Sequence, residues 1–199
     1  MGTTVLVTLL PLLVFKYSAL AGELLSRTGV VGGTKSLTLD LLLPVGISLY
    51  SLQAVSYLID VYRHERAPER DLSMLALYLA FFPQILARPI ERARNLMSQL
   101  RDFSIPTAPE LFVAAKILIW GFFCKLVLAD KLAMIADPIL LEYKSHFPAE
   151  LVVVLVFYSF WIYFDFFAYS TIAIGLARLF GVQLSLNFNH PYLATSIQE

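Results

Sequence analysis

Long apolar stretches, separated by short polar segments, form the dominant pattern of hydrophobic and polar positions along the chain. The longest stretch, residues 151–177, contains one charged side chain, Asp165, and has aromatic residues crowded at its middle. A helix of this length would measure about 40 Å, enough to cross the roughly 30 Å hydrocarbon core of a bilayer. The pattern therefore predicts a membrane-spanning helix that carries one acidic group, followed by an irregular polar loop at residues 181–196.

Three other apolar stretches are also predicted to span the membrane, namely residues 1–22, 41–59 and 111–129. Two lysines, Lys116 and Lys125, interrupt the third stretch, and we expect both to extend their ammonium groups to the membrane surface. Residues 23–40 and 130–150 are predicted to be polar loops, because these segments combine Gly or Pro with charged residues.

A further apolar segment, residues 72–87, is predicted to enter the membrane without crossing it. Pro83 and Gln84 interrupt this segment, and arginines flank it on both sides. Because short Arg-rich loops tend to stay on the cytoplasmic side, both ends of the segment are expected on the same side of the membrane. Non-helical backbone at membrane depth has to be buried in protein or line a cavity, so we expect a broken, re-entrant helix.

Composition supports these assignments. The chain has 58% hydrophobic and 15% charged residues, whereas a soluble domain has about 45–50% apolar and about 25% charged residues. The sequence therefore predicts an all-α polytopic membrane protein of about four transmembrane helices plus one re-entrant segment, with residues 1–199 in a single membrane domain. We expect a lipid bilayer as its environment, and the net charge of zero argues against nucleic acid as a partner.

Asp165 is the residue that the pattern alone marks for chemistry. An acid at the centre of a membrane helix costs about 2.5–3.5 kcal/mol. We therefore favour a role in orienting a catalytic group or a substrate hydroxyl over a purely structural bond to a Tyr hydroxyl or to a Lys of another helix. No metal site is predicted, because His64, His146 and His190 lie far apart in the sequence and none has a ligand-like spacing.

Four separated motifs, taken together and in this order, resemble the membrane-bound O-acyltransferase (MBOAT) family, in particular its bacterial alginate O-acetylation branch. They are GISLYSLQAVSYLIDVYR (46–63), FFPQILARPIERARNLMSQL (81–100), WGFFCKLVLAD (120–130) and YSFWIYFDFFAYSTIAIGLARLFGVQLSLNFNHPYLATSI (158–197). The resemblance implies a ring of helices around a funnel, in the bacterial inner membrane. It implies an O-acyltransferase that moves an acetyl or other acyl group from acetyl-CoA or another acyl thioester to a polysaccharide hydroxyl, sometimes through partner acetyl-transfer proteins.

The resemblance also implies which residues line the funnel. These candidates are Gln53, Tyr57, Gln84, Arg92, Tyr163, Asp165, Asn187 and Asn189. From the residues alone, a basic flank of a membrane segment is the interpretation we favour for most of the arginines around Arg92, and the functional alternative is a basic mouth for a phosphate-bearing donor such as acyl-CoA. The two asparagines could simply turn the chain ahead of Pro191. For each of these three residues, both interpretations remain open at this point.

No catalytic residue is expected within the chain itself. The family's general base is a His that follows an aromatic and Arg-rich run, and that run comes directly after a segment like residues 191–199. The base is therefore expected beyond Glu199, and we expect the chain to be an internal, inactive fragment that lacks both ends. Relatives commonly have a Gly at Arg88, a Lys at Cys124, and Ser, Gly and Asp at Phe167, Ala168 and Thr171.

Two alternatives to polysaccharide acetylation remain. Within the same family, the acyl group could be D-alanine and the acceptor teichoic acid. Outside the enzymes, the chain could be a non-catalytic membrane remnant, a scaffold or a transporter. Transporters usually contain inverted repeats, and the sequence shows no internal repeat, which argues against that class.

Overall fold

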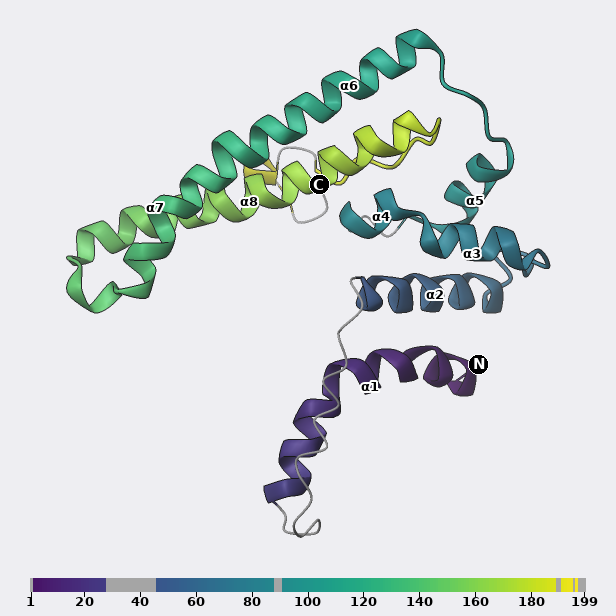
Figure 1. Cartoon of the computed structure of the whole chain (residues 1–199), viewed down its shortest axis with the longest axis horizontal. Helices are drawn as coiled ribbons and strands as arrows, with labels where there is room; N and C mark the ends of the chain where they lie inside the picture. Colours follow the sequence, from purple (N-terminus) through teal and green to yellow (C-terminus); the bar gives the residue numbers. More distant parts are fainter. Residues whose placement is uncertain (1, 28–45, 88–90, 189–190, 195, 197–199) are drawn as a thin grey trace. The chain divides into compact units, whose positions relative to one another are not determined.

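The computed structural model describes residues 2–27, 46–87, 91–188, 191–194 and 196. Within these residues all regular secondary structure is helical, which confirms the all-α prediction (Figure 1). The chain forms two compact units: Met1–Ala80 with Arg92–Arg94, and Phe81–Glu91 with Asn95–Glu199.

The first unit contains α1 (Gly2–Arg27), α2 (Ile47–Tyr62) and α3 (Leu72–Ala80). Helix α1 continues beyond the predicted end of its span at residue 22, and its ribbon bends along its length (Figure 1). Pro11 is its one interior proline, and an interior proline removes a backbone hydrogen bond. Helix α2 has 16 residues, so it measures about 24 Å, less than the thickness of a hydrocarbon core. Residues 41–45 of its predicted span lie outside the described residues.

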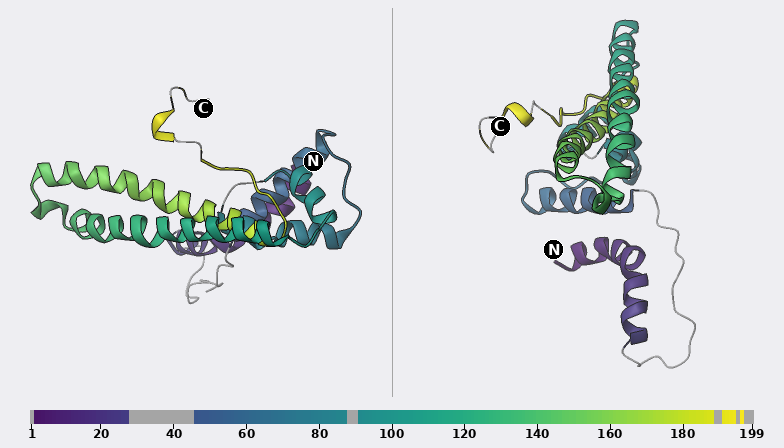
Figure 2. Two further views of the ribbon diagram at one scale, coloured as in Figure 1. Left: turned by 90° about the horizontal axis from the view of Figure 1, so that it is seen from above. Right: turned by 90° about the vertical axis from the view of Figure 1, so that its left-hand side faces the viewer.

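The second unit is built on a long helical hairpin. Its first arm runs without interruption from Ala108 to Leu141 through α6 (Ala108–Phe123), a π-helical turn η1 (Cys124–Ala129) and α7 (Asp130–Leu141). Its second arm is α8 (Pro148–Leu179), which returns antiparallel to the first (Figures 1 and 2). Both arms are long and apolar enough to cross a membrane by length and composition.

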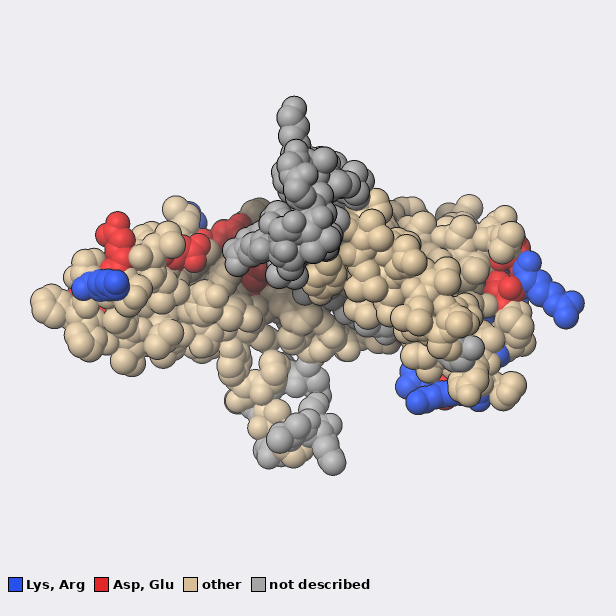
Figure 3. Space-filling model, turned by 90° about the horizontal axis from the view of Figure 1, so that it is seen from below, with Lys and Arg blue, Asp and Glu red and all other residues tan. Residues whose placement is uncertain are grey.

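The hairpin shows that the loop predicted at residues 130–150 is too long, and its charge distribution agrees with the predicted membrane spans. The loop predicted at residues 130–150 is wrong over its first half, because Asp130–Leu141 is helical and the connection takes only the few residues around η2 (Tyr143–Ser145). Asp130 pairs with Lys125 inside the helix, so its charge does not mark a loop. Figure 3 shows acidic and basic side chains where α7 meets α8, and mainly uncharged surface beside them. That distribution suits a membrane-spanning hairpin with its turn at the surface.

Both arms begin with strong helix-start signals. Before α6, the backbone N–H of Thr107 donates to a carboxylate oxygen of Glu110 at 2.7 Å, which forms half of a capping box. Before α8, Phe147 donates in the same way to Glu150 at 3.3 Å, and Pro148 occupies the first helical position. Helix α8 ends at Leu179, two residues before Gly181, whose φ of 70° suits glycine, and the chain then continues as an extended segment.

The predicted break in residues 72–87 is confirmed. Helix α3 ends at Ala80, Phe81 is not helical, and α4 (Phe82–Ala87) begins after it. Helix α4 belongs to the second unit, where the ring of Phe82 meets that of Phe180 edge-on at 5.6 Å. The re-entrant path itself stays a prediction. Helix α5 (Ala93–Arg101) precedes the extended connection to α6, and a short 3-10 helix, η3 (Pro191–Leu193), lies near the end of the chain.

Candidate functional site

A charged cluster joins the two arms of the hairpin. The Lys125 ammonium donates to Asp165 Oδ1 at 2.6 Å and lies 2.8 Å from Asp130 Oδ1. The Lys125 and Asp165 side chains are 24% and 28% exposed. The ammonium also lies 5.2 Å from the ring centroid of Tyr169. With one cation between two carboxylates, the cluster has a formal charge of −1.

The π-helical turn brings Lys125 and Asp130 to the same side of the first arm. The Asp130 N–H bonds to the Lys125 carbonyl, five residues back. In this wider turn, residues five apart lie one above the other, whereas in an α-helix they would diverge around the axis. The local backbone geometry therefore lets both charged side chains approach Asp165 on α8.

This geometry corrects the expectation for Lys125. Its ammonium pairs with Asp165 and does not extend alone to the membrane surface. For Asp165, the structural partner weighed in the sequence analysis, a Lys from another helix, is present. The cation offsets the cost of placing an acid within an apolar helix. The other lysine, Lys116, lies 4.4 Å from the ring centroid of Phe112, and its predicted extension to the surface remains a prediction.

An aromatic group lines a different face of α8. The ring of Phe188, from the extended segment after α8, lies edge-on to Tyr163, Phe166 and Phe167 with centroid distances of 5.7, 5.1 and 5.9 Å. One residue earlier, Asn187 Nδ2 donates to the buried Ser170 hydroxyl at 3.1 Å. Tyr163 and Ser170 share this face, which the extended segment covers.

Asp165 lies two residues from Tyr163 on α8, about 200° around the helix axis. It therefore faces the first arm, while Tyr163 and Asn187 meet on the face that the extended segment covers. Three of the predicted funnel residues thus lie at the middle of α8, Asp165 on one face and Tyr163 with Asn187 of the extended segment on another. Gln84 is buried on α4 in the same unit, and Asn189 lies outside the described residues.

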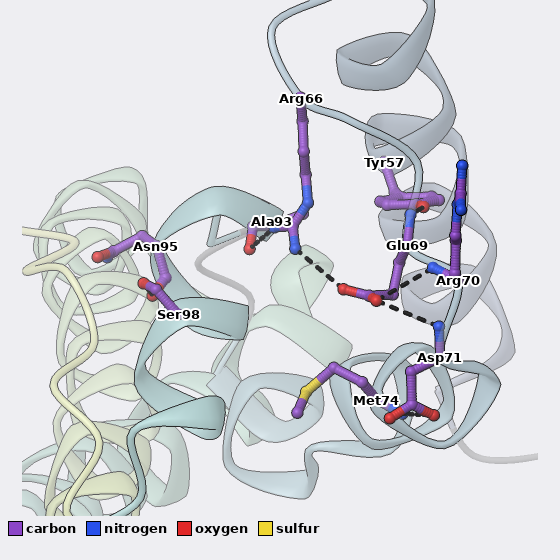
Figure 4. A network of polar contacts seen from close by, with 9 residues as sticks. All are labelled: Tyr57, Arg66, Glu69, Arg70, Asp71, Met74, Ala93, Asn95 and Ser98. Carbon is purple, nitrogen blue, oxygen red and sulfur yellow. Dashed lines mark hydrogen bonds and ion pairs between the residues drawn. The ribbon is translucent and has the colours of Figure 1, made fainter.

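The remaining candidates belong to the first unit and have structural partners there. Gln53 is buried and donates to the Tyr78 carbonyl at 2.8 Å. The Tyr57 hydroxyl accepts from the backbone N–H of Glu69 at 2.7 Å (Figure 4). The Arg92 side chain is 79% exposed and lies 3.8 Å from Glu65. Whether these three line a common funnel with α8 stays a prediction.

Figure 4 shows why the loop between α2 and α3 has a fixed shape. Arg66 donates to the Ala93 carbonyl at 2.6 Å and lies 3.5 Å from Glu69. The Glu69 carboxylate also accepts the backbone N–H groups of Arg70 and Asp71 at 3.1 and 3.2 Å. Within the first unit, Arg66 therefore acts as a loop anchor, a role that the charge pattern alone did not indicate.

A separate cavity of about 450 Å³ opens between α7 and α8 near the hairpin turn. Its walls are mainly apolar, including Ile135, Val153 and Phe157, and at its edge the His146 ring nitrogen Nδ1 lies 2.9 Å from a carboxylate oxygen of Glu150. Glu150 precedes Asp165 by fifteen residues, or about 22 Å along α8. The cavity is therefore distinct from the Lys125 cluster. No three metal-ligating side chains come together in the part of the chain that the structure describes.

We expect Phe188→Ala to loosen the extended segment, because three ring contacts on α8 are lost. For a half-buried ring the expected loss is about 1–3 kcal/mol of local docking free energy. Limited proteolysis of the detergent-solubilised chain should then cut between residues 181 and 194 faster than in the unaltered chain. The matched control is Leu186→Ala, since Leu186 is 83% exposed. Equal cleavage rates for the two variants would contradict the docking of Phe188.

The sequence of the chain is similar to those of several curated bacterial proteins. The chain is 36% identical over 159 residues to the "Probable alginate O-acetylase AlgI" of Azotobacter vinelandii, covering 80% of this chain and 32% of that protein. It is 33% identical over 188 residues to the peptidoglycan O-acetyltransferase of Helicobacter pylori, covering 81% and 36%. It is 29% identical over 177 residues to the teichoic acid D-alanyltransferase of Streptococcus thermophilus, covering 85% and 41%.

The chain belongs to the membrane-bound O-acyltransferase family. No family model matches it, so the assignment comes from these pairwise similarities. The chain spans about a third of the length of the curated relatives it matches.

Three departures from the MBOAT pattern can be located on α8. Phe167 contacts Phe188, and Ala168 is fully buried. The Thr171 hydroxyl donates to the Phe167 carbonyl at 2.8 Å, four residues back on the same helix. In this MBOAT chain the three positions therefore contribute packing and a local helix bond. Cys124, where the family resemblance leads us to expect Lys, is buried in the π-helical turn.

Proposed function

We propose that the protein carrying this chain transfers an acetyl group, or a related acyl group, to hydroxyls of a cell-surface polysaccharide. The observation that supports this most is the similarity over about 80% of the chain to proteins named for O-acetylation of two different polysaccharides. The proposed donor is acetyl-CoA or another acyl thioester. The proposed setting is a bacterial inner membrane, crossed several times, with partner acetyl-transfer proteins delivering or receiving the acyl group.

In the proposed reaction the acceptor hydroxyl oxygen attacks the thioester carbonyl carbon. A C–O bond forms, the C–S bond breaks, and the hydroxyl proton passes through a general base to the departing thiolate. The Lys125–Asp165 pair fixes the first arm against α8 and would have a structural role in the proposed funnel. Asn187, held beside Ser170, provides a polar group on the face of α8 that carries the aromatic cluster.

Deleting the complete gene in its source organism tests this proposal. We expect the deletion to remove O-acetyl esters from the surface polysaccharide, as measured by proton NMR of the purified polymer, and the unaltered gene to restore them. If polysaccharide esters persist while D-alanyl esters disappear from teichoic acid, the D-alanyl alternative is correct; lower-identity relatives of that name make it the second candidate. If neither ester changes, the acyl-transfer proposal is wrong and a non-catalytic membrane role is favoured.

A further inference from the structure

A polar stripe at α5 contacts the extended segment that follows α8. Asn95 and Gln99 are four residues apart on α5 and share one side of the helix, and Glu91, just before α5, is linked to that side by its hydrogen bond from Asn95. Glu91 is only 6% exposed although it is charged. One of its carboxylate oxygens accepts the backbone N–H of Ser185 at 2.9 Å, and the other accepts the Ser185 hydroxyl at 3.0 Å. Asn95 also donates to this carboxylate.

Gln99 makes a second, reciprocal contact one step along the same segment. Its Oε1 accepts the backbone N–H of Gln183 at 2.7 Å, and its Nε2 donates to the Gln183 carbonyl at 3.0 Å. The side-chain amide thus satisfies both backbone groups of Gln183, as a neighbouring β-strand would. Side chains along this segment alternate as in a strand, because Val182 and Leu184 are buried whereas Gln183 and Ser185 are exposed. A side chain of α5 thus makes the backbone hydrogen bonds that a neighbouring strand would make in a sheet.

These contacts determine where the next residues of the segment lie. Asn187 is two residues beyond Ser185, so it can lie at most about 7 Å along the chain from the point that Glu91 holds. From there it reaches Ser170 on α8, and Phe188 enters the aromatic group. The backbone of the segment is therefore fixed on one side by the stripe at α5 and on the other by α8, all within the second unit.

We propose that Glu91 and Gln99 are positioning residues that hold the extended segment of residues 182–187 so that Asn187 is presented on α8 for acyl transfer. The assignment rests on the proposed function. It names residues that the sequence analysis did not select: in the motif at residues 81–100, Glu91 reaches the motif at residues 158–197, whereas the adjacent Arg92 is exposed and lies near Glu65. We refer to Glu91 and Gln99 together as the latch.

The chemistry of the latch makes Glu91→Gln informative. The carboxylate accepts three hydrogen bonds from neutral donors, and a glutamine of the same size has only one acceptor oxygen. An amide NH₂ would face donors, which leaves buried polar groups without partners. Gln99→Ala removes the second contact. Ser98→Ala is the matched control, since among the described residues the Ser98 hydroxyl bonds to the Asn95 carbonyl of its own helix.

Hydrogen exchange followed by mass spectrometry tests the latch on the detergent-solubilised chain. In Glu91→Gln and in Gln99→Ala we expect the amides of residues 183–187 to exchange about 10- to 100-fold faster, with exchange in α8 unchanged. Ser98→Ala should match the unaltered chain. If Glu91→Gln and Gln99→Ala both leave exchange of this segment within about twofold of the unaltered chain, the latch does not exist.

A second measurement separates positioning from general support of the fold. In the protein from the complete gene, Glu91→Gln should lower kcat for acyl transfer and leave the KM for the thioester donor unchanged, as Asn187→Ala should. If the latch acts through Asn187, the double variant loses no more activity than Asn187→Ala alone. Multiplied losses would overturn the positioning role. If the unaltered protein transfers no acyl group, the proposed function fails and the positioning role with it, while the exchange result still decides whether the latch exists.

Discussion

Replacing Lys125 with Met should destabilise the helical hairpin more than any other single change to its charged residues. The variant leaves the Asp165 carboxylate in an apolar helix without the cation 2.6 Å away. Removing one partner of a buried ion pair costs about 3–5 kcal/mol. The partial exposure of both side chains reduces the expected loss to roughly 2–4 kcal/mol. Thermal unfolding in detergent, followed by circular dichroism at 222 nm, measures the effect.

Two further variants make this test specific. Lys116→Met removes a lysine that contacts the ring of Phe112, and we expect it to change stability by less than about 1 kcal/mol. The double variant Lys125→Met with Asp165→Leu should recover much of the loss, because apolar side chains of similar volume often replace a buried ion pair at little cost. If Lys125→Met is no less stable than Lys116→Met, the pair does not hold the two arms together.

The apolar pattern predicted the second arm closely and the first arm only in part. The stretch at 151–177 became α8, Pro148–Leu179, because an uninterrupted apolar run with a proline at its start favours one long helix. The first arm was predicted to end at residue 129, since prolines and charged residues between 130 and 150, among them Pro138 and Lys144, are typical of a loop. In the structure Asp130 finds its partner within the same helix, across the π-helical turn. A turn of that kind leaves no signature in hydrophobic periodicity.

Burial explains most of what the sequence could not reveal about the candidate site. Asp165 was selected because a charge in an apolar run is conspicuous, but its partner Lys125 lies 40 residues away and only the fold brings them together. Glu91 was overlooked because a charged residue between arginines is typical of an exposed surface. Its burial depends on Ser185, 94 residues later. Sequence alone identifies charged residues whose placement in an apolar segment costs free energy, whereas the contacts that offset this cost come from the tertiary structure.

The second prediction with a large expected effect is a loss of stability in Gly121→Ala, because the two arms of the hairpin pack closely at Gly121. A Cβ atom there would lie 2.7 Å from Ile172 Cγ1 and 3.0 Å from the Ile172 backbone nitrogen on α8. The backbone cannot move aside locally, so Gly121→Ala should force the helices apart and cost about 1–3 kcal/mol. This sign is opposite to the intrinsic preference, since Ala favours a helix over Gly by about 1 kcal/mol.

Two other glycines allow the expected loss of stability at Gly121 to be compared with sites where an added Cβ has more room. At Gly175 an added Cβ would approach the Leu118 side chain at 2.7 Å, but the Leu118 backbone nitrogen only at 3.2 Å. A side chain can rotate, so Gly175→Ala should cost less than Gly121→Ala. Gly2 has open space around it, and Gly2→Ala should be neutral or slightly stabilising. Melting temperatures in the order Gly121→Ala lowest, then Gly175→Ala, then Gly2→Ala would support the close approach of the two arms. If Gly121→Ala raises the melting temperature as Gly2→Ala does, the arms do not pack at this distance.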